Sequence, residues 1–401
     1  MTDATDATDS TDSTDSTDST DSTDSTDQPT QWWRMFDRKF VQYFDWGLLG
    51  LAVVLGGLGL TTLYSVVTAD PMTLGKTLYF KQMTWFCGGL VLMVITCSFN
   101  YKLLDRYAFA VYIVCLATLV AVLLFGKYAG GSKRWLVLGP VSVQPSEMAK
   151  LAIIIVLARY YSKNAYTRGF TLRDLFIPAV LVLVPAFLII KQPDLGTALL
   201  LAIIAGSMTL FVKIEKRSLL ALIFAGTLAV PMVWFVLKDY QKQRILTFLN
   251  PDRDPLGAGY HIIQSKIAIG SGMLVGKGYL KGTQNALSFL PEQHTDFIFS
   301  VFAEEWGFVG CAILVLVFLL LIVWGLNVAY SCRDPFGNIL AVGVSAMIFW
   351  QVFVNIGMVM GLMPVVGVPL PFISYGGSSI ATMMVSIGLL INVSMRRFTL
   401  E

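Results

Sequence analysis

Long apolar runs dominate this chain and decide what it can fold into. A run of roughly 20 apolar residues spans a hydrocarbon core about 30 Å thick, and a helix is the element that satisfies its own backbone in lipid. Ten such runs lie at 46–67, 80–99, 105–125, 145–161, 174–190, 194–212, 218–237, 300–325, 337–360 and 374–394. The fourth, fifth and last are short or are interrupted by proline or charge. The sequence therefore predicts an all-α polytopic membrane protein with about ten transmembrane helices.

Composition excludes several other classes of protein. Hydrophobic residues make up 55% of the chain and charged residues only 14%, whereas ordinary soluble domains carry about 25% charged residues. The pattern excludes a soluble enzyme, a disordered protein and a nucleic-acid-binding domain. The five cysteines have no CxxC or metal-ligand spacing, and four lie in or beside apolar runs. We therefore expect neither a disulfide nor a metal cluster.

Residues 1–30 form a segment of a different kind. The repeat Thr-Asp-Ser runs almost unbroken to Asp27, and nine of the 26 acidic residues of the chain lie in the first 27 positions. Such a segment has nothing to bury, so we expect a disordered, solvated cytoplasmic tail. It lacks the basic start and apolar middle of a signal peptide. The tail is either a dispensable extension, which we favour, or a regulatory arm, and the membrane domain is residues 31–401.

The distribution of Lys and Arg predicts the orientation. With a cytoplasmic N-terminus, the inner short segments hold fifteen Lys and Arg and the short outer loops hold six, as the positive-inside rule requires. Ten spans then place both termini in the cytoplasm. The segment 238–299 becomes a long outer loop, rich in Pro, Gly, aromatic and charged residues, and we expect it to be ordered and to carry chemistry.

Several charged residues lie inside or beside the predicted membrane spans, where burying a charge costs free energy. Glu147 and Lys150 fall inside the fourth run and share one helix face. They form either a structural pair or the polar floor of a substrate cavity. Asp194 is either the N-cap of the sixth helix or a residue lining the same cavity. Lys133 and Arg134, in an outer loop, either anchor the chain in the headgroup region or clamp a phosphate.

Two further segments stand out. Asp296 directly precedes the apolar run 300–325, so it is either the N-cap of that helix or a general base at the mouth of a lipid-accessible cavity. Glu304 and Glu305 are adjacent and point to different sides, so at least one of them must be buried in protein. The segment 364–379 holds three prolines and three glycines, which forbid a regular helix. It is either a simple re-entrant turn or the wall of a watery cavity.

Six segments occur in order at positions that fit the predicted topology. They are 131–135, 144–147 with Lys150, 192–197, 270–272 with 276–278, 290–299 and 371–379. Taken together, these segments resemble the SEDS family of RodA, FtsW and their sporulation relatives. The resemblance covers about residues 40–397, and 365–371 is similar to the rod-shape members.

The resemblance implies a function. SEDS proteins are peptidoglycan glycosyltransferases that polymerise lipid II into β-1,4 glycan on the outer face of the bacterial cytoplasmic (inner) membrane. Rod-shape members act in cell-wall elongation, paired with a class B penicillin-binding protein and other membrane proteins of the elongation complex. The donor sugar is α-linked, so the reaction inverts the anomeric centre. A lipid II flippase and a noncatalytic scaffold are the alternatives.

The resemblance also implies roles for residues. Asp296 matches the essential aspartate and is the expected general base. Four outer cations are expected to hold pyrophosphate: Lys133, Arg134, Arg244 and Lys277. Glu147 and Lys150 are positioning residues, and further substrate contacts are expected from Asp194, His294, Ser374 and Ser378. A divalent cation, Mg²⁺ or Mn²⁺, could assist, but no ligand set in the sequence demands one.

Overall fold

The computed structural model describes residues 43–69, 74–129, 132–138, 141–164, 169–236, 239–251, 254, 257–286 and 294–397. The tail predicted at residues 1–30 lies outside the described residues.

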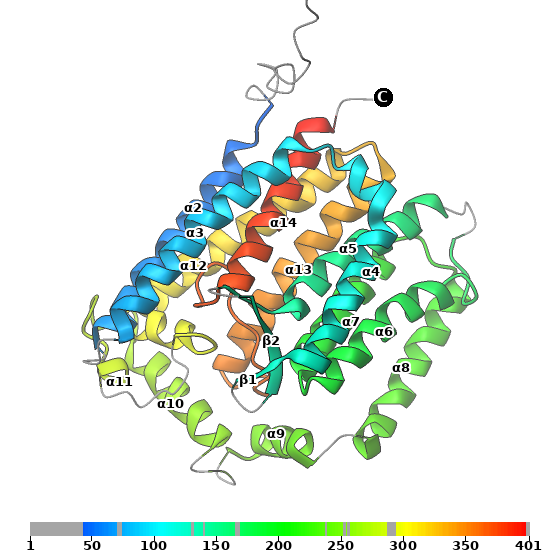
Figure 1. Cartoon of the computed structure of the whole chain (residues 1–401). Coiled ribbons are helices and arrows are strands. Elements are labelled where there is room, and N and C mark those ends of the chain that lie inside the picture. The colour runs from blue at the N-terminus through cyan, green and yellow to red at the C-terminus, as the bar shows by residue number, and fades with distance from the viewer. Residues whose placement is uncertain are drawn as a thin grey trace, which may run out of the picture.

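Long helices make up most of the described chain (Figure 1). They are α2 (Trp46–Ala69), α3 (Leu74–Ser98), α4 (Lys102–Phe125), α5 (Pro145–Lys163), α6 (Phe176–Lys191), α7 (Leu195–Phe211), α8 (Lys216–Val236), α12 (Ile298–Ser331), α13 (Pro335–Val359) and α14 (Gly377–Arg396). Each predicted apolar run overlaps one of them, so the all-α architecture is confirmed. Among the described helices, α2, α3, α4, α12, α13 and α14 are long and apolar enough to cross a membrane, and α6 and α7 are shorter apolar helices. The exact number of spans stays a prediction.

Helices α13 and α14 form the core of the bundle. Helix α13 packs against α5, α7 and α12, and α14 packs along α3. Figure 1 shows α2, α3 and α12 on one side of this pair, α4 to α7 on the other, and α8 standing apart at the edge. Most side chains of α13 and α14 are buried, whereas the outer helices expose rings such as Phe80 and Phe125. Large exposed rings of this kind are expected where a helix faces lipid.

One end of the bundle carries the irregular structure. It holds three antiparallel strands, β1 (Lys127–Ala129), β2 (Ser132–Leu138) and β3 (Val141–Val143), and three helices, α9 (Asp239–Leu249), α10 (Ala258–Ser271) and α11 (Thr283–Ala286). The start of α2 and the end of α14 lie together at the opposite end (Figure 1). The sequence indicated only a loop where the sheet forms. The described parts of the segment 238–299 include helices α9 to α11, and the order of the whole loop stays a prediction.

Helix α12 is broken near its start. Gly307 has φ 65 and ψ −165, so two helical pieces meet at this residue. The amides of Phe308 and Val309 donate instead to the carbonyls of Met273 and Leu274, at 2.9 and 3.1 Å. The loop after α10 therefore satisfies the backbone that the break exposes.

Candidate active site

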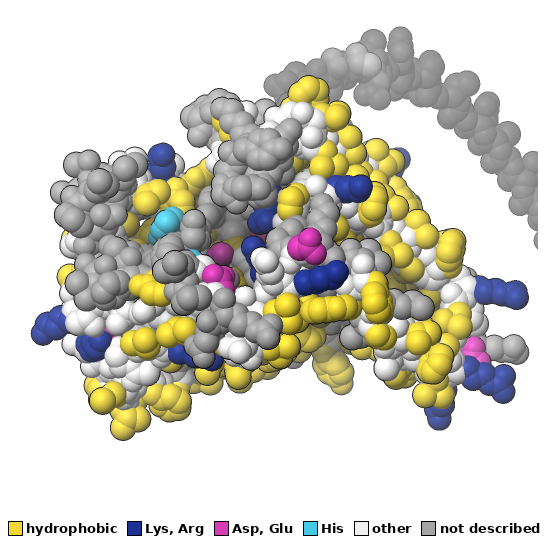
Figure 2. Space-filling view, turned by 90° about the horizontal axis from the view of Figure 1, so that it is seen from below, with side chains coloured by type: hydrophobic (Ala, Val, Ile, Leu, Met, Phe, Trp, Pro, Cys, Tyr) yellow, Lys and Arg dark blue, Asp and Glu magenta, His cyan; other side chains and the backbone are white. Residues whose placement is uncertain are grey.

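Charged side chains gather on the end of the molecule that carries α9 to α11. Figure 2 looks onto this end and shows Asp or Glu, Lys or Arg, and His side chains near its middle, with hydrophobic side chains toward the periphery. A polar centre within an apolar rim suits a substrate with a charged head and a lipid tail.

Asp296 lies in the segment that leads into α12. Phe297 occupies the N-cap position of this helix, so Asp296 precedes the cap, and the N-cap interpretation of this residue is wrong. A Cβ added to Gly367 would lie 3.4 Å from Asp296 Oδ2. The carboxylate therefore faces the segment between α13 and α14, which has no regular helix from residue 361 to residue 376, as its prolines and glycines predict.

The backbone of residues 294–296 is tied to that segment. The Tyr375 amide donates to the His294 carbonyl at 2.9 Å. The Ser374 hydroxyl donates to the Thr295 carbonyl at 2.6 Å. Ser374 Oγ also accepts from the Leu370 amide at 2.8 Å. Ser374 therefore joins the two segments, and a contact between its hydroxyl and substrate stays a prediction.

Two buried amide side chains complete these ties. Asn355, on α13, donates from Nδ2 to the Asp296 carbonyl at 3.0 Å and to the Val368 carbonyl at 2.7 Å. Gln82, on α3, donates to the Ser374 carbonyl at 3.1 Å and accepts from the Gly376 amide at 3.2 Å. Sequence reasoning missed both residues, although a lone amide inside an apolar run was an available signal.

Ser378 brings the start of α5 to the same place. Its hydroxyl accepts from the Gln144 amide at 3.0 Å and donates to the Ser142 carbonyl at 3.3 Å. The N-terminus of α5 therefore lies beside the N-terminus of α14. This contact places the first turn of α5, with Glu147, next to the end of the segment that Asp296 faces.

Glu147 and Lys150 form the predicted contact. Lys150 Nζ donates to Glu147 Oε1 at 2.8 Å, and both side chains are buried. Glu147 Oε2 and the hydroxyl of Ser146 are buried without a hydrogen-bond partner. Buried polar atoms without partners are costly, so this part of α5 carries more polarity than packing alone requires.

Arg134 and Asp194 are also brought together. Arg134 Nη1 lies 3.8 Å from Asp194 Oδ2, and its Nη2 donates to the Pro193 carbonyl at 2.6 Å. Asp194 accepts from the Thr197 amide at 3.2 Å. The N-cap interpretation of Asp194 is confirmed, and the same carboxylate also orients Arg134.

The remaining expected cations differ in their surroundings. Lys277 Nζ lies 2.6 Å from the fully buried Glu304 carboxylate and 2.7 Å from Thr283 Oγ1. It is therefore committed to an internal ion pair. Arg244 is exposed and donates to the Val365 carbonyl at 3.3 Å, so it lies beside the segment that Asp296 faces. The side chain of Lys133, on β2, is outside the described part of the structure.

Glu304 and Glu305 are both buried, which confirms the prediction that at least one of them would be. Glu305 accepts a hydrogen bond from Ser65 on α2. Burial, with the nearby Glu305 carboxylate, raises the pKa of the Tyr279 phenol. The phenol donates to the Thr61 carbonyl at 3.2 Å, which fastens the loop after α10 to α2.

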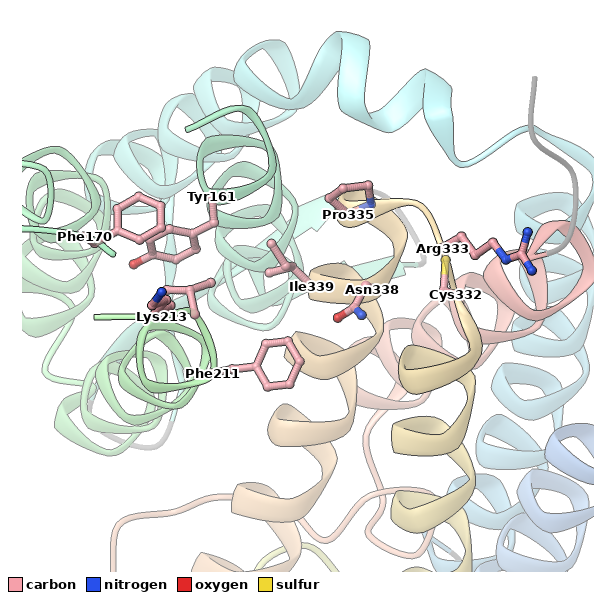
Figure 3. Close-up of a pocket in the computed structure, with 10 residues that line it drawn as sticks. Tyr161, Phe170, Phe211, Lys213, Cys332, Arg333, Pro335, Asn338 and Ile339 are labelled. Atoms are coloured by element: carbon pink, nitrogen blue, oxygen red, sulfur yellow. The ribbon is translucent and has the colours of Figure 1, made fainter. Parts of the chain in front are cut away.

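A pocket of about 320 Å³ lies at the other end of the bundle. Figure 3 shows it between the ends of α5 and α7 and the start of α13, with Tyr161, Phe170, Phe211 and Ile339 in its wall and the Arg333 guanidinium directed away. Asp296 precedes the start of α12, whereas the pocket includes Cys332, just beyond the end of that helix. The pocket therefore does not contribute to the site around Asp296.

Comparison with known proteins identifies the class of molecule to which this fold and site belong. The family model FtsW/RodA/SpoVE, described as cell cycle protein, matches residues 44–398. The peptidoglycan glycosyltransferase MrdB of Escherichia coli is 46% identical over 311 residues, which cover 77% of this chain and 83% of that protein. The peptidoglycan glycosyltransferase RodA of Treponema pallidum is 34% identical and covers 89% of this chain and 99% of its own length.

Solved structures agree with the sequence matches. A chain of a peptidoglycan synthase complex superposes with a TM-score of 0.76 at 34% identity, covering 88% of this chain and 98% of that one. Thermus thermophilus RodA gives a TM-score of 0.65 at 30% identity, covering 89% and 98%. The chain is a multi-pass membrane protein that belongs to the FtsW/RodA/SpoVE family. The matches to MrdB and RodA confirm the predicted similarity to the rod-shape members.

Proposed function

We propose that this chain is a peptidoglycan glycosyltransferase that polymerises lipid II into β-1,4 glycan strands for cell-wall elongation. The names of its relatives support the activity. The observation that carries the site assignment is the placement of Asp296. Its carboxylate faces Gly367, its backbone is tied to α13, and charged side chains gather on the same end of the molecule.

Asp296 acts as the general base in this proposal. Its carboxylate takes the proton from the 4-hydroxyl of the acceptor sugar. The oxygen attacks the anomeric carbon of the donor from the face opposite the pyrophosphate. The new bond is β because the α-linked pyrophosphate leaves from the other face, and the leaving group keeps the bonding electron pair. An ordered base within hydrogen-bond reach of the acceptor is what this step requires.

Of the expected cations whose side chains the structure describes, Arg134 and Arg244 are the best placed for the departing pyrophosphate. Arg134 is held by Asp194 and the Pro193 carbonyl, and a pre-oriented guanidinium can bind phosphate oxygens with two parallel hydrogen bonds. Arg244 is exposed beside Val365. Lys277 already neutralises Glu304, so we assign it a supporting role in the loop after α10.

A divalent cation remains a candidate partner for the pyrophosphate. Among the described residues, no three His, Cys, Asp or Glu side chains gather to hold a metal. This part of the chain therefore offers no preformed cage, and the oxygen ligands that Mg²⁺ prefers would come chiefly from the substrate. The proposed proton transfer and leaving-group contacts use protein groups alone.

The partner and the location extend the proposal. One structural neighbour belongs to a complex described as coordinating polymerization and crosslinking. We propose that this chain likewise pairs with a class B penicillin-binding protein and works with other membrane proteins of the elongation complex. The end carrying α9 to α11 would face outward from the bacterial inner membrane, with both termini in the cytoplasm.

Purified protein mixed with labelled lipid II tests the proposal, with and without the penicillin-binding partner. Glycan polymer is the expected product. Asp296→Asn should lower polymerisation roughly 10²–10⁴-fold, the contribution of a general base, without loss of expression. Asp239→Asn is the matched control, because Asp239 is an exposed carboxylate at the start of α9. Near-normal synthesis by Asp296→Asn would remove the base assignment. Movement of lipid II across vesicles without polymer would indicate a transporter, and neither activity would indicate a scaffold.

A further inference from the structure

The backbone that carries Asp296 is held unusually tightly. Three consecutive carbonyls, those of residues 294, 295 and 296, each accept a hydrogen bond from a different residue. The first two donors, Tyr375 and Ser374, belong to the irregular segment itself. The third donor, Asn355, belongs to the long buried helix α13, whose regular backbone holds it in place.

Asn355 bridges two segments: the one that carries Asp296 and the one, between α13 and α14, that the Asp296 carboxylate faces. One hydrogen of Nδ2 goes to the carbonyl of Asp296 and the other to the carbonyl of Val368. Val368 adjoins Gly367, which faces Asp296 Oδ2. A single amide nitrogen therefore sets the separation between the segment that bears the carboxylate and the segment that the carboxylate faces.

The positions of the nitrogen and oxygen in the Asn355 amide follow from its contacts, and this orientation leaves the oxygen without a hydrogen-bond partner. Both short contacts are to carbonyl oxygens, so the nitrogen must point toward them. Asn355 is fully buried, and its Oδ1 has no hydrogen-bond partner. Gln351, one turn earlier on α13, is also fully buried with both amide atoms unpartnered. Unpartnered buried polar atoms in native proteins call for an explanation beyond packing.

We propose that Asn355 is a positioning residue for the glycosyl transfer, acting through Asp296. This inference rests on the proposed function and adds to it the device that fixes the base. Asn355 holds the peptide plane that follows Asp296, and Ser374 holds the plane that precedes it through the Thr295 carbonyl. Together the two planes fix the direction of the Cα–Cβ bond of Asp296. A displacement of about 1 Å in a catalytic group can cost about 10²-fold in rate.

The chain provides a matched control in Asn392. This residue of α14 is also buried, and its Nδ2 also bridges two carbonyls, those of Thr96 and Phe99, at 2.6 and 2.5 Å. It lies near the end of α14 (Gly377–Arg396), whereas the site is at the start of that helix. Asn392→Ala therefore removes the same kind of bridge, together with a hydrogen bond that Asn392 Oδ1 accepts from Arg396, without touching Asp296.

The experiment compares Asn355→Ala with Asn392→Ala for unfolding temperature, lipid II binding, and the kcat and KM of polymerisation. Both variants should lose stability. Only Asn355→Ala should lose kcat, by roughly 10–100-fold, with KM changed less than about threefold. The same change in an Asp296→Asn background should cause no further loss, because residues that act as a unit are not additive.

Equal kcat values for Asn355→Ala and Asn392→Ala would overturn the inference. If Asn355→Ala does not fold, Asn355→Thr, which keeps one donor, is measured by the same criterion. Failure of both to fold, while Asn392→Ala folds, would make Asn355 purely structural and also overturn it. A near-normal Asp296→Asn would instead remove the assignment of Asp296 as the base, and absence of glycan polymer from the unaltered protein would overturn the proposed function. These failures are therefore distinguishable from failure of the inference about Asn355.

Discussion

Replacing Glu147 by glutamine should destabilise the protein strongly, because it leaves the Lys150 ammonium buried without its partner. The two side chains are exposed by only 4% and 1%, and their charged atoms lie 2.8 Å apart. Removing one member of a buried pair costs about 3–5 kcal/mol, since the remaining charge is desolvated and uncompensated.

The two single variants should differ in a definite direction. Glu147 lies in the first turn of α5, where the helix dipole favours a carboxylate by about 0.3–1 kcal/mol, and by up to about 2 kcal/mol in partly buried sites. Lys150→Met leaves a carboxylate that keeps this favourable interaction. Glu147→Gln leaves an ammonium near the positive end of the helix. We therefore expect Glu147→Gln at the upper end of the 3–5 kcal/mol range and Lys150→Met at or below its lower end.

A variant that changes both residues shows how much of the lost stability comes from breaking the ion pair and how much from burying a single charge. Glu147→Gln combined with Lys150→Met removes both charges, and such a replacement can be nearly neutral. The coupling between the two changes should then be about 5 kcal/mol or more, a factor above about a thousand in the unfolding equilibrium. Thermal and denaturant unfolding in detergent micelles measures it.

Lys163→Met is the control for this series. Lys163 ends the same helix, its side chain is 55% exposed, and it lies 3.9 Å from Asp105. An exposed pair of this kind contributes about 0–1 kcal/mol. If Glu147→Gln cost no more than Lys163→Met, the reasoning about the buried charge would be refuted.

Activity answers a second question about the same pair. The resemblance places Glu147 and Lys150 beneath the substrate cavity, and Ser378 brings their helix beside the segment that Asp296 faces. The double variant should therefore recover folding and remain impaired in polymerisation. Full recovery of glycan synthesis would show that the pair only stabilises the fold.

Three further predictions concern other parts of the chain. Deleting residues 1–28 should leave polymerisation and unfolding temperature almost unchanged, and a large loss of synthesis would make the tail a working part. Gly276→Ala should destabilise by roughly 1–3 kcal/mol, as overpacking does, because φ is +84 and the added Cβ would lie 2.1 Å from the Glu305 carbonyl. Gly57→Ala, with nothing within 4 Å, should not destabilise in the same assay. Arg134→Lys should raise the KM for lipid II, since lysine cannot form the bidentate contact, and an unchanged KM would exclude Arg134 from pyrophosphate binding.

The helices could be predicted from the sequence because their cause is local. A segment that spans lipid has to be long and apolar, and both properties are read along the chain. The run 145–161 became α5 (Pro145–Lys163), with its proline at the first helical position, where a missing amide hydrogen costs nothing. The pair Glu147 and Lys150 followed from the same helical spacing.

The strands and the glycine motif could not be predicted in this way. The segment 127–143 is too short and polar for a spanning helix, and its pairing depends on register, which composition does not reveal. Gly272 and Gly276 were identified only because they match the family motif. The physical reason that glycine is needed at both positions is a contact with residues far away in sequence. A Cβ on either would lie 2.1 Å from a backbone carbonyl of α12. No local pattern shows that two backbones approach this closely.

The site shows the same division between local and long-range causes. Asp296 was found because it precedes an apolar run within a matching motif. Its positioning depends on Asn355, which is 59 residues away in sequence, and on Gln82, which ties Ser374 from α3 across 292 residues. Non-helical backbone inside a membrane protein must be satisfied by protein groups. The donors that meet this requirement for residues 294–296 also fix the base, so the same hydrogen bonds that make an irregular segment tolerable in the bundle give it catalytic geometry.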